Sequence, residues 1–133
     1  MEVKIDTKEK FTVVTPVVPH ISANIAANLA ETCTSYLDQP VKNIILNLEP
    51  VTEIDPEAAN SIAALQQRFY EQNASFVICN LKEPLEAVFE KEELLDFLNL
   101  TPTESEAWDI VQMEEIEREL LDGDEMEFSD VNQ

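Results

Sequence analysis

The sequence contains a single glycine, Gly123, close to its C-terminal end. Loops that hold nucleotide phosphates use several glycines, because their backbone must turn tightly and approach the phosphate closely. The scarcity of glycine therefore excludes the glycine-rich dinucleotide and P-loop nucleotide sites.

Basic residues are also scarce, with 8 Lys and Arg against 28 Asp and Glu and a formal net charge of −20. Such a surface repels phosphate backbones, so we expect no direct binding to nucleic acid. No apolar stretch approaches the ~20 residues that cross a bilayer, and no signal-peptide pattern opens the sequence. We therefore expect a cytoplasmic protein with no direct membrane insertion.

Residues suited to catalysis or metal binding are few. The two cysteines, Cys33 and Cys79, lie far apart among apolar neighbours. This pattern indicates buried thiols and neither a redox motif nor a metal site. The one histidine, His20, follows a proline in a connecting loop, and we interpret it as a loop residue without a positioned catalytic partner. We expect no enzymatic activity, no cofactor and no metal.

The negative charge is concentrated at the C-terminal end. Residues 104–133 include twelve acidic residues and one basic residue, Arg118. We predict a folded domain over residues 1–121 and an acidic, disordered tail over residues 122–133. The tail is interpreted as a solubilising segment, with electrostatic guidance of a basic partner as the alternative.

Apolar periodicity predicts an α/β fold. Short apolar runs that alternate with amphipathic segments indicate a mostly parallel sheet of about five strands, flanked by about four helices. Two strands at the N-terminus are close enough to form a hairpin. The predicted strands are 3–5, 11–15, 43–48, 74–79 and 97–100, and the predicted helices are 22–37, 55–73, 84–93 and 103–121.

The junction between the third strand and the second helix is the most informative segment. Asp55 is suited to cap a helix, Pro56 to the first helical position, and Glu57 to the positive end of the helix dipole. In α/β folds, ligands and modifications are often handled where a strand leads into a helix N-terminus. The sequence therefore points to this junction as the functional site.

Residues 43–65, NIILNLEPVTEIDPEAANSIAAL, resemble the signature of STAS domains, the fold shared by anti-sigma factor antagonists and the cytoplasmic tails of sulfate transporters. In that signature, Leu-Asp-Leu-Ser leads through Val-x-x-Ile-Asp to Ser-Ser-Gly. Residues 46–49 correspond to its first part, with Asn47 in place of Asp, and Val51, Ile54 and Asp55 match the middle. The resemblance implies a STAS-like fold over residues 3–120, with residues 94–108 similar to the family's last strand and helix.

The chain departs from the signature at the position where the antagonists carry a phosphorylated serine. The resemblance implies that antagonists are phosphorylated by a partner kinase on a serine after the conserved Asp, where this chain has Pro56, Glu57 and Ala58. A carboxylate cannot carry the regulatory phosphate, so we expect no phosphoacceptor at Glu57. Glu57 either imitates phosphoserine in part or is only a favourable helix-start residue.

The resulting functional hypothesis is a protein–protein interaction module of the STAS type. Its implied partner is an anti-sigma factor with a serine-kinase ATPase fold. The alternatives are an accessory STAS subunit of a membrane transport assembly and an anion- or nucleotide-binding STAS domain. The identity of the partner and the oligomeric state stay open. The predicted partner-binding residues are Glu53, Asp55, Pro56, Glu57, Ala58, Ser61 and Ile62.

Overall fold

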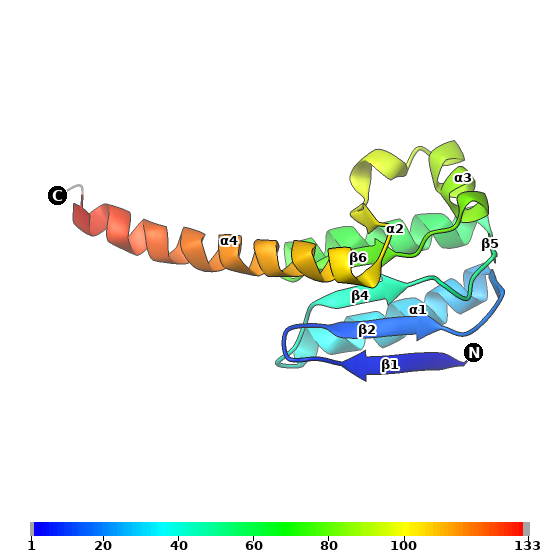
Figure 1. Cartoon of the computed structure of the whole chain (residues 1–133), viewed down its shortest axis with the longest axis horizontal. Helices are drawn as coiled ribbons and strands as arrows, with labels where there is room; N and C mark the ends of the chain where they lie inside the picture. Colours follow the sequence, from blue (N-terminus) through cyan, green and yellow to red (C-terminus); the bar gives the residue numbers. More distant parts are fainter. Residues whose placement is uncertain (1, 132–133) are drawn as a thin grey trace.

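The main sheet has five strands in the order β1-β2-β4-β6-β7 (Figure 1). The computed structural model describes the backbone of residues 2–131 and the side chains of residues 2–121. β1 and β2 are antiparallel, and each later neighbour is parallel. The α/β prediction of a mostly parallel sheet with an N-terminal hairpin is therefore confirmed. The bounds are β1 Val3–Thr7, β2 Thr12–Pro16, β4 Ile44–Asn47, β6 Phe76–Cys79 and β7 Leu100–Thr101.

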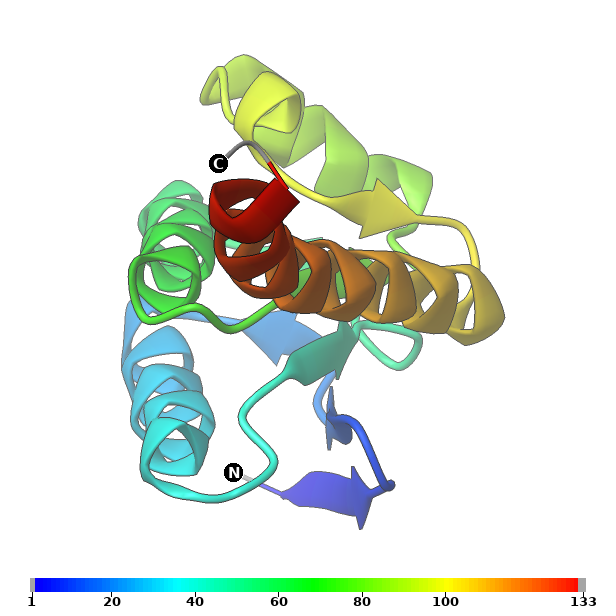
Figure 2. The same ribbon diagram turned by 90° about the vertical axis from the view of Figure 1, so that its left-hand side faces the viewer.

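The four predicted helices are present, and they lie on both faces of the sheet (Figure 2). α1, α2 and α3 contribute buried residues to one apolar cluster, whereas α4 packs on the other face against β4 and β6. The bounds are α1 Ala23–Ser35, α2 Pro56–Glu71, α3 Glu83–Lys91 and α4 Glu104–Val131, with short 3₁₀ helices η1 Tyr36–Asp38 and η2 Leu95–Phe97.

Two helix starts are capped by hydroxyl side chains. The Ser22 hydroxyl accepts a hydrogen bond from the Ile25 amide at 3.4 Å, and the Thr103 hydroxyl accepts one from the Glu106 amide at 3.2 Å. Each hydroxyl satisfies one of the amides that a helix N-terminus leaves without an intrahelical partner.

Left-handed backbone positions are taken by residues other than glycine. Asn73, Asn80 and Glu93 each have φ of 59°, where glycine is the least strained residue and asparagine is the next most common choice. Asn73 ends the turn after α2, and Glu93 does the same after α3. The chain thus makes these turns without the glycines that it lacks.

The buried core includes both thiols. Cys33 and Cys79 are fully buried, as predicted, and burial raises the pKa of each thiol to about 12. The charges of Glu104 and Glu49 add to this rise at Cys79. Both thiols are therefore protonated at neutral pH and serve as small apolar side chains.

Polar contacts fix α4 on the sheet. The Arg118 guanidinium donates to the Ser75 hydroxyl at 3.0 Å. The hydroxyl of Tyr70, which lies on α2, donates to the Glu114 carboxylate of α4 at 2.6 Å. Burial, reinforced by the Glu114 hydrogen bond and charge, raises the pKa of Tyr70. These contacts orient one face of α4 toward the sheet.

The structure differs from the predicted elements in three places. The segment predicted as a strand over residues 97–100 begins as η2, and only Leu100–Thr101 pairs with β6. Two short strands, β3 His20–Ile21 and β5 Glu53–Ile54, were not predicted. The backbone of α4 is helical to Val131, beyond the predicted end at residue 121. The division into a domain and a disordered tail at residue 122 stays a prediction.

Candidate functional site

The junction between β4 and α2 is fixed by a second, two-stranded sheet. β3 and β5 are parallel, with His20 opposite Glu53 and Ile21 opposite Ile54. The Pro19 carbonyl accepts from the Glu53 amide at 2.9 Å, and the Ile21 carbonyl accepts from the Asp55 amide at 3.0 Å. These bonds join the entry to α1 with the entry to α2, so the helix N-terminus is held on a rigid base.

The Asp55 carboxylate contacts His20 and does not cap α2. Its Oδ1 lies 2.7 Å from His20 Nε2, and no hydrogen bond joins the Asp55 side chain to the first turn of α2. Our interpretation of His20 as a loop residue without a positioned partner is therefore wrong. The two residues lie 35 positions apart, and only the β3–β5 pairing brings them together.

The Asp55 contact controls the protonation of His20. The hydrogen bond to Asp55 raises the pKa of His20 above its ordinary value, and the negative charges of Asp55 and Glu53 add to the rise. Partial desolvation opposes it. His20 thus provides a positive charge among the carboxylates of the junction over a wider pH range than a free histidine.

The structure separates the predicted partner-binding residues into two groups. Ala58 and Ile62 are fully buried and pack in the core, so they support the site from within. The remaining residues reach the surface: Glu53, Pro56, Glu57 and Ser61 are exposed and Asp55 is half-buried. Any direct contact with a partner must therefore come from this second group, and which of its members bind stays a prediction.

The first turn of α2 is linked to α3. The Asn60 amide donates to the Pro56 carbonyl at 3.0 Å and to the Glu92 carboxylate at 2.9 Å. The Ser61 hydroxyl donates to the Glu57 carbonyl at 3.1 Å, so it bonds within its own helix. These contacts hold the first turn of α2, which carries the Glu57 side chain, in a fixed position.

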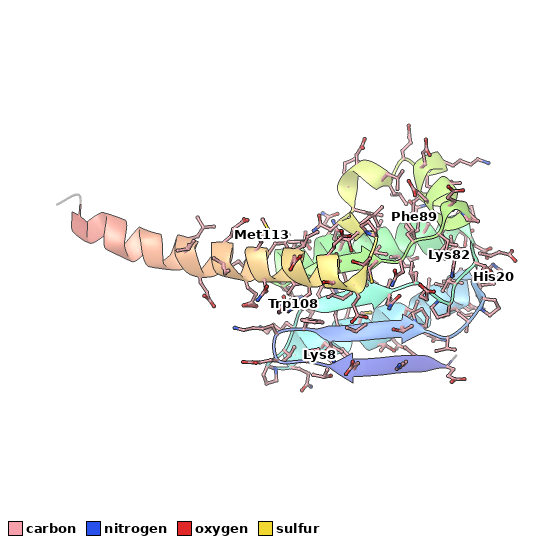
Figure 3. All side chains as sticks on the ribbon, viewed as in Figure 1. Lys8, His20, Lys82, Phe89, Trp108 and Met113 are labelled. Carbon is pink, nitrogen blue, oxygen red and sulfur yellow. The ribbon has the colours of Figure 1, made fainter. Side chains whose placement is uncertain are left out.

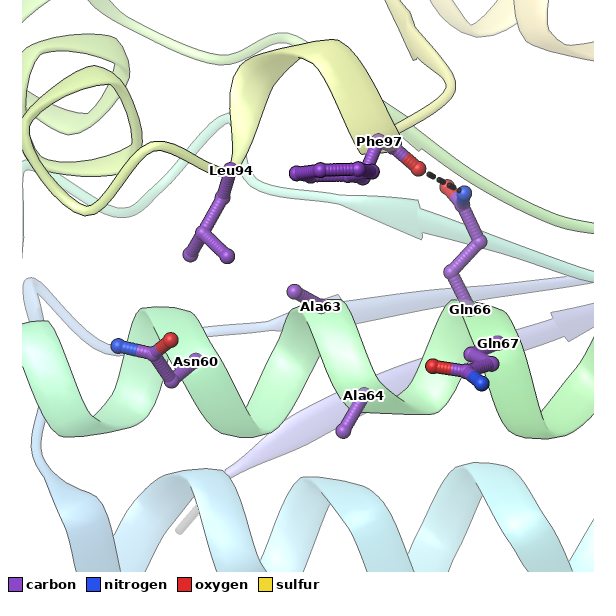
Figure 4. A pocket seen from close by; sticks show the side chains of 7 residues that line it. All are labelled: Asn60, Ala63, Ala64, Gln66, Gln67, Leu94 and Phe97. Atoms are coloured by element: carbon purple, nitrogen blue, oxygen red, sulfur yellow. Dashed lines mark hydrogen bonds between the residues drawn. The ribbon is translucent and has the colours of Figure 1, made fainter.

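An apolar groove runs along α2 next to the junction, and the sequence did not predict it. Its volume is about 540 Å³. Phe97, which is 73% exposed, lies over Ala63 on one side of the groove (Figure 4). Gln66 fixes this side, since its amide donates to the Phe97 carbonyl at 2.5 Å. The lining residues are Asn60, Ala63, Ala64, Gln66, Gln67, Leu94 and Phe97.

Polar side chains also meet at the carboxyl ends of β4 and β6. Asn47 Oδ1 accepts from the Glu49 amide and from the Asn80 side chain, each at 3.0 Å. The Lys82 ammonium donates to the Glu49 carbonyl, and it lies at the same end of the molecule as His20 (Figure 3). Asn47, which replaces the aspartate of the STAS signature, thus acts here as a structural link.

The side chains that reach the surface around the start of α2 are mainly acidic: Glu53, Asp55 and Glu57. Among residues 2–121, Asp55 is the only side-chain hydrogen-bond partner of His20. The same part of the chain has no group of three His, Cys, Asp or Glu side chains placed to hold a metal ion. None of its helices combines the length and apolar character needed to cross a membrane.

Solved structures with this fold include several anti-sigma factor antagonists. A putative anti-sigma factor antagonist from Thermotoga maritima has a TM-score of 0.72 at 18% identity, covering 83% of this chain and 94% of its own. The anti-sigma factor antagonist SpoIIAA in its unphosphorylated form has a TM-score of 0.67 at 16% identity, covering 84% of this chain and 96% of its own. These similarities show the shared fold.

A membrane transporter also contains a matching region. The murine solute carrier 26 family member A9 anion transporter has a TM-score of 0.63 at 14% identity, and the match covers 81% of this chain. It covers only 18% of the transporter. The same fold therefore occurs both in small antagonists and within a much larger protein.

Comparison of sequences gives one family. Curated protein sequences give no significant match. The STAS domain profile, however, matches residues 2–107, which include every strand of both sheets and the helices α1, α2 and α3. The chain belongs to the STAS domain family.

Proposed function

We propose that this STAS domain is a non-catalytic module of cytoplasmic signal transduction that binds a protein partner through the junction at residues 53–62. The observation that carries the proposal is the cluster of Glu53, Asp55 and Glu57 around the start of α2, on a base fixed by β3–β5 pairing. A rigid, charged surface favours specific recognition, because little ordering is needed on binding.

The proposed partner is an anti-sigma factor with a serine-kinase ATPase fold, so the process served is transcription regulation. This proposal is supported by the likeness to anti-sigma factor antagonists, including SpoIIAA, which has been solved in phosphorylated and unphosphorylated forms. The groove along α2 supplies apolar surface beside the acidic junction. A polar rim next to an apolar centre is typical of protein interfaces.

We further propose that Glu57 occupies the position of the phosphoacceptor serine in related antagonists. Its carboxylate cannot carry a regulatory phosphoester, and its exposed place in the first turn of α2 is where a phosphate would meet the positive end of the helix dipole. The partner would then be bound in a manner that phosphorylation at this position does not control.

Affinity capture with immobilised wild-type chain, followed by mass spectrometry, tests the identity of the partner. Sigma-regulatory proteins among the captured partners would support the proposal. Transporter subunits would instead favour an accessory role in a transport assembly, the second candidate, which the match to an anion transporter supports.

Titration of the captured partner against variants tests the site. We expect Glu57→Lys to weaken binding about tenfold or more, equivalent to about 1.4 kcal/mol. The matched control is Glu71→Lys, the same charge change at an exposed position at the other end of α2. Equal affinities of the wild-type chain and Glu57→Lys would overturn the junction as the interface.

The two interpretations of Glu57 are separated by Glu57→Gln, which removes the charge and keeps the shape. Under either interpretation, losing the charge in the first turn of α2 makes unfolding easier by about 0.3–1 kcal/mol. If Glu57 imitates phosphoserine, the affinity for the partner changes as well. If Glu57 only favours the helix start, the affinity stays constant.

A third candidate, anion or nucleotide binding at the start of α2, is disfavoured by the structure. Asp55 and Glu57 place negative charge at the helix N-terminus where an anion would lie. The repulsion would oppose the attraction of the helix dipole.

A further inference from the structure

The outer side of α4 carries a group of exposed apolar side chains that the junction does not involve. Several large apolar side chains exposed together on one helix indicate an interaction surface. Met113, Ile116 and Leu120 recur at intervals of three and four residues, and they are 59%, 53% and 56% exposed. We call these three residues the α4 stripe.

The α4 stripe faces away from the sheet. At about 100° per residue, its three side chains lie within about 60° of one another around the helix axis. Ala107 and Val111, which are buried against the sheet, lie roughly half a turn from that direction. Met113 marks the stripe on α4 in Figure 3. The stripe is therefore the side of the helix that packing on the sheet leaves without a partner.

The charges that α4 itself places beside the stripe are negative, whereas Lys10, from the segment before β2, lines a hollow together with Ile116 and Glu119. Glu117 and Glu119 flank the stripe on its two sides and are exposed, and Asp109 precedes it by one turn. Arg118, the one basic residue of α4, is directed to the sheet, where it donates to Ser75 and Asn43. On α4 itself the stripe is thus bordered by acidic residues, with Lys10 as a single basic neighbour near Ile116.

We propose that the α4 stripe binds an amphipathic helix of a partner protein, with an apolar stripe bordered by Lys or Arg. Apolar residues at intervals of three and four are how one helix recognises another. Acidic margins select basic margins on the partner and speed encounter with it. A second copy of this chain is a poorer occupant, since Glu117 and Glu119 of both copies would face like charges.

This surface is separate from the junction. β5, at the start of α2, lies at one end of the molecule, and the part of α4 that carries the stripe extends toward the other end (Figure 1). The proposal is therefore independent of the proposed function, and the domain could hold one partner at the junction and a second at α4.

The test measures binding of a synthetic amphipathic peptide to the full chain by fluorescence anisotropy. The peptide has leucine at heptad positions a and d and lysine at e and g, so that it does not associate with itself. A control peptide has glutamate in place of lysine. We expect saturable binding of the lysine peptide that weakens as salt is raised, and no binding of the glutamate peptide.

Variants locate the binding site. Ile116→Ser combined with Leu120→Ser should weaken binding of the lysine peptide about tenfold or more. Leu121 is 64% exposed but lies off the stripe. The affinity of Leu121→Ser for the lysine peptide should therefore stay within about twofold of that of the wild-type chain. Because all three side chains are exposed, these changes should leave the fold intact, as circular dichroism would verify.

Two results would overturn the proposal. The first is equal binding of the lysine peptide by the wild-type chain and the double variant. That result would show that the peptide is held by the overall negative charge of the chain and not by the stripe. The second is a dimer of the wild-type chain in sedimentation that the double variant abolishes, which would make a second copy the occupant of the stripe.

Discussion

At the scale of single residues, the junction depends on the contact between His20 and Asp55. Oδ1 of Asp55 lies 2.7 Å from Nε2 of His20, and both side chains are nearly half exposed. Exposed ion pairs add little to stability. The contact instead favours the protonated form of His20 and holds the Asp55 carboxylate against it.

We predict that the pKa of His20 lies above its ordinary value of 6.5 in the folded chain, because Asp55 accepts a hydrogen bond from its imidazolium and Asp55 and Glu53 are negative. Asp55→Asn should lower it, since the amide oxygen carries no charge. Titration of the imidazole by NMR measures both values. As a control, Glu53→Gln should cause a smaller decrease, and an unchanged value in Asp55→Asn would contradict the prediction.

The sign of the pH effect on stability follows from the same shift. A raised pKa in the folded chain means that the protonated His20 stabilises the fold. This contribution is fully present below the pKa of the unfolded chain and is lost as the pH rises through the pKa of the folded chain. The difference in unfolding free energy between the wild-type chain and Asp55→Asn should therefore shrink as the pH is raised through this window.

At the scale of elements, α2 connects the junction to the segment before β7. Its inward residues Ala58, Ile62, Leu65 and Phe69 recur at intervals of three and four residues and are buried. Gln66 is buried on the same helix. Its amide donates to the Phe97 carbonyl, and its Oε1 accepts from the Asn99 amide at 2.7 Å. One side chain thus provides hydrogen-bond partners for the Phe97 carbonyl and the Asn99 amide.

We predict that Gln66→Leu destabilises the fold by about 1–3 kcal/mol, because backbone groups of Phe97 and Asn99 would lose their hydrogen-bond partner. Urea unfolding measures the change. Gln67→Leu is the matched control, since Gln67 is exposed on the same helix. That substitution should alter stability by less than about 0.5 kcal/mol, and equal effects of the two variants would refute the role of Gln66.

At the scale of the whole molecule, the dominant property is the net charge of −20. Three ion pairs occur among residues 2–121, and they join Lys8 to Asp6, His20 to Asp55 and Arg118 to Glu115. Most carboxylates therefore face water and repel one another, and this repulsion favours expansion of the chain.

We predict that the thermal unfolding midpoint rises as salt is added, because ions screen repulsion beyond about 10 Å at 0.1 M. Differential scanning calorimetry across a salt series measures the rise. The variant with Glu117→Gln and Glu119→Gln should show a shallower dependence on salt. A midpoint that falls with salt would mean that attractive ion pairs outweigh the repulsion.

The sequence by itself determined the succession of the four helices and of the main-sheet strands along the chain, the burial of both cysteines and the helix start at the junction. Apolar spacing and hydroxyl caps act over a few residues, so they can be read locally. The tertiary structure alone decided the β3–β5 pairing, the His20–Asp55 contact, the bonds of Gln66 and the outward direction of the α4 stripe. Two-residue strands show no periodicity, and these contacts join residues far apart in the chain, so only packing of the whole domain brings them together.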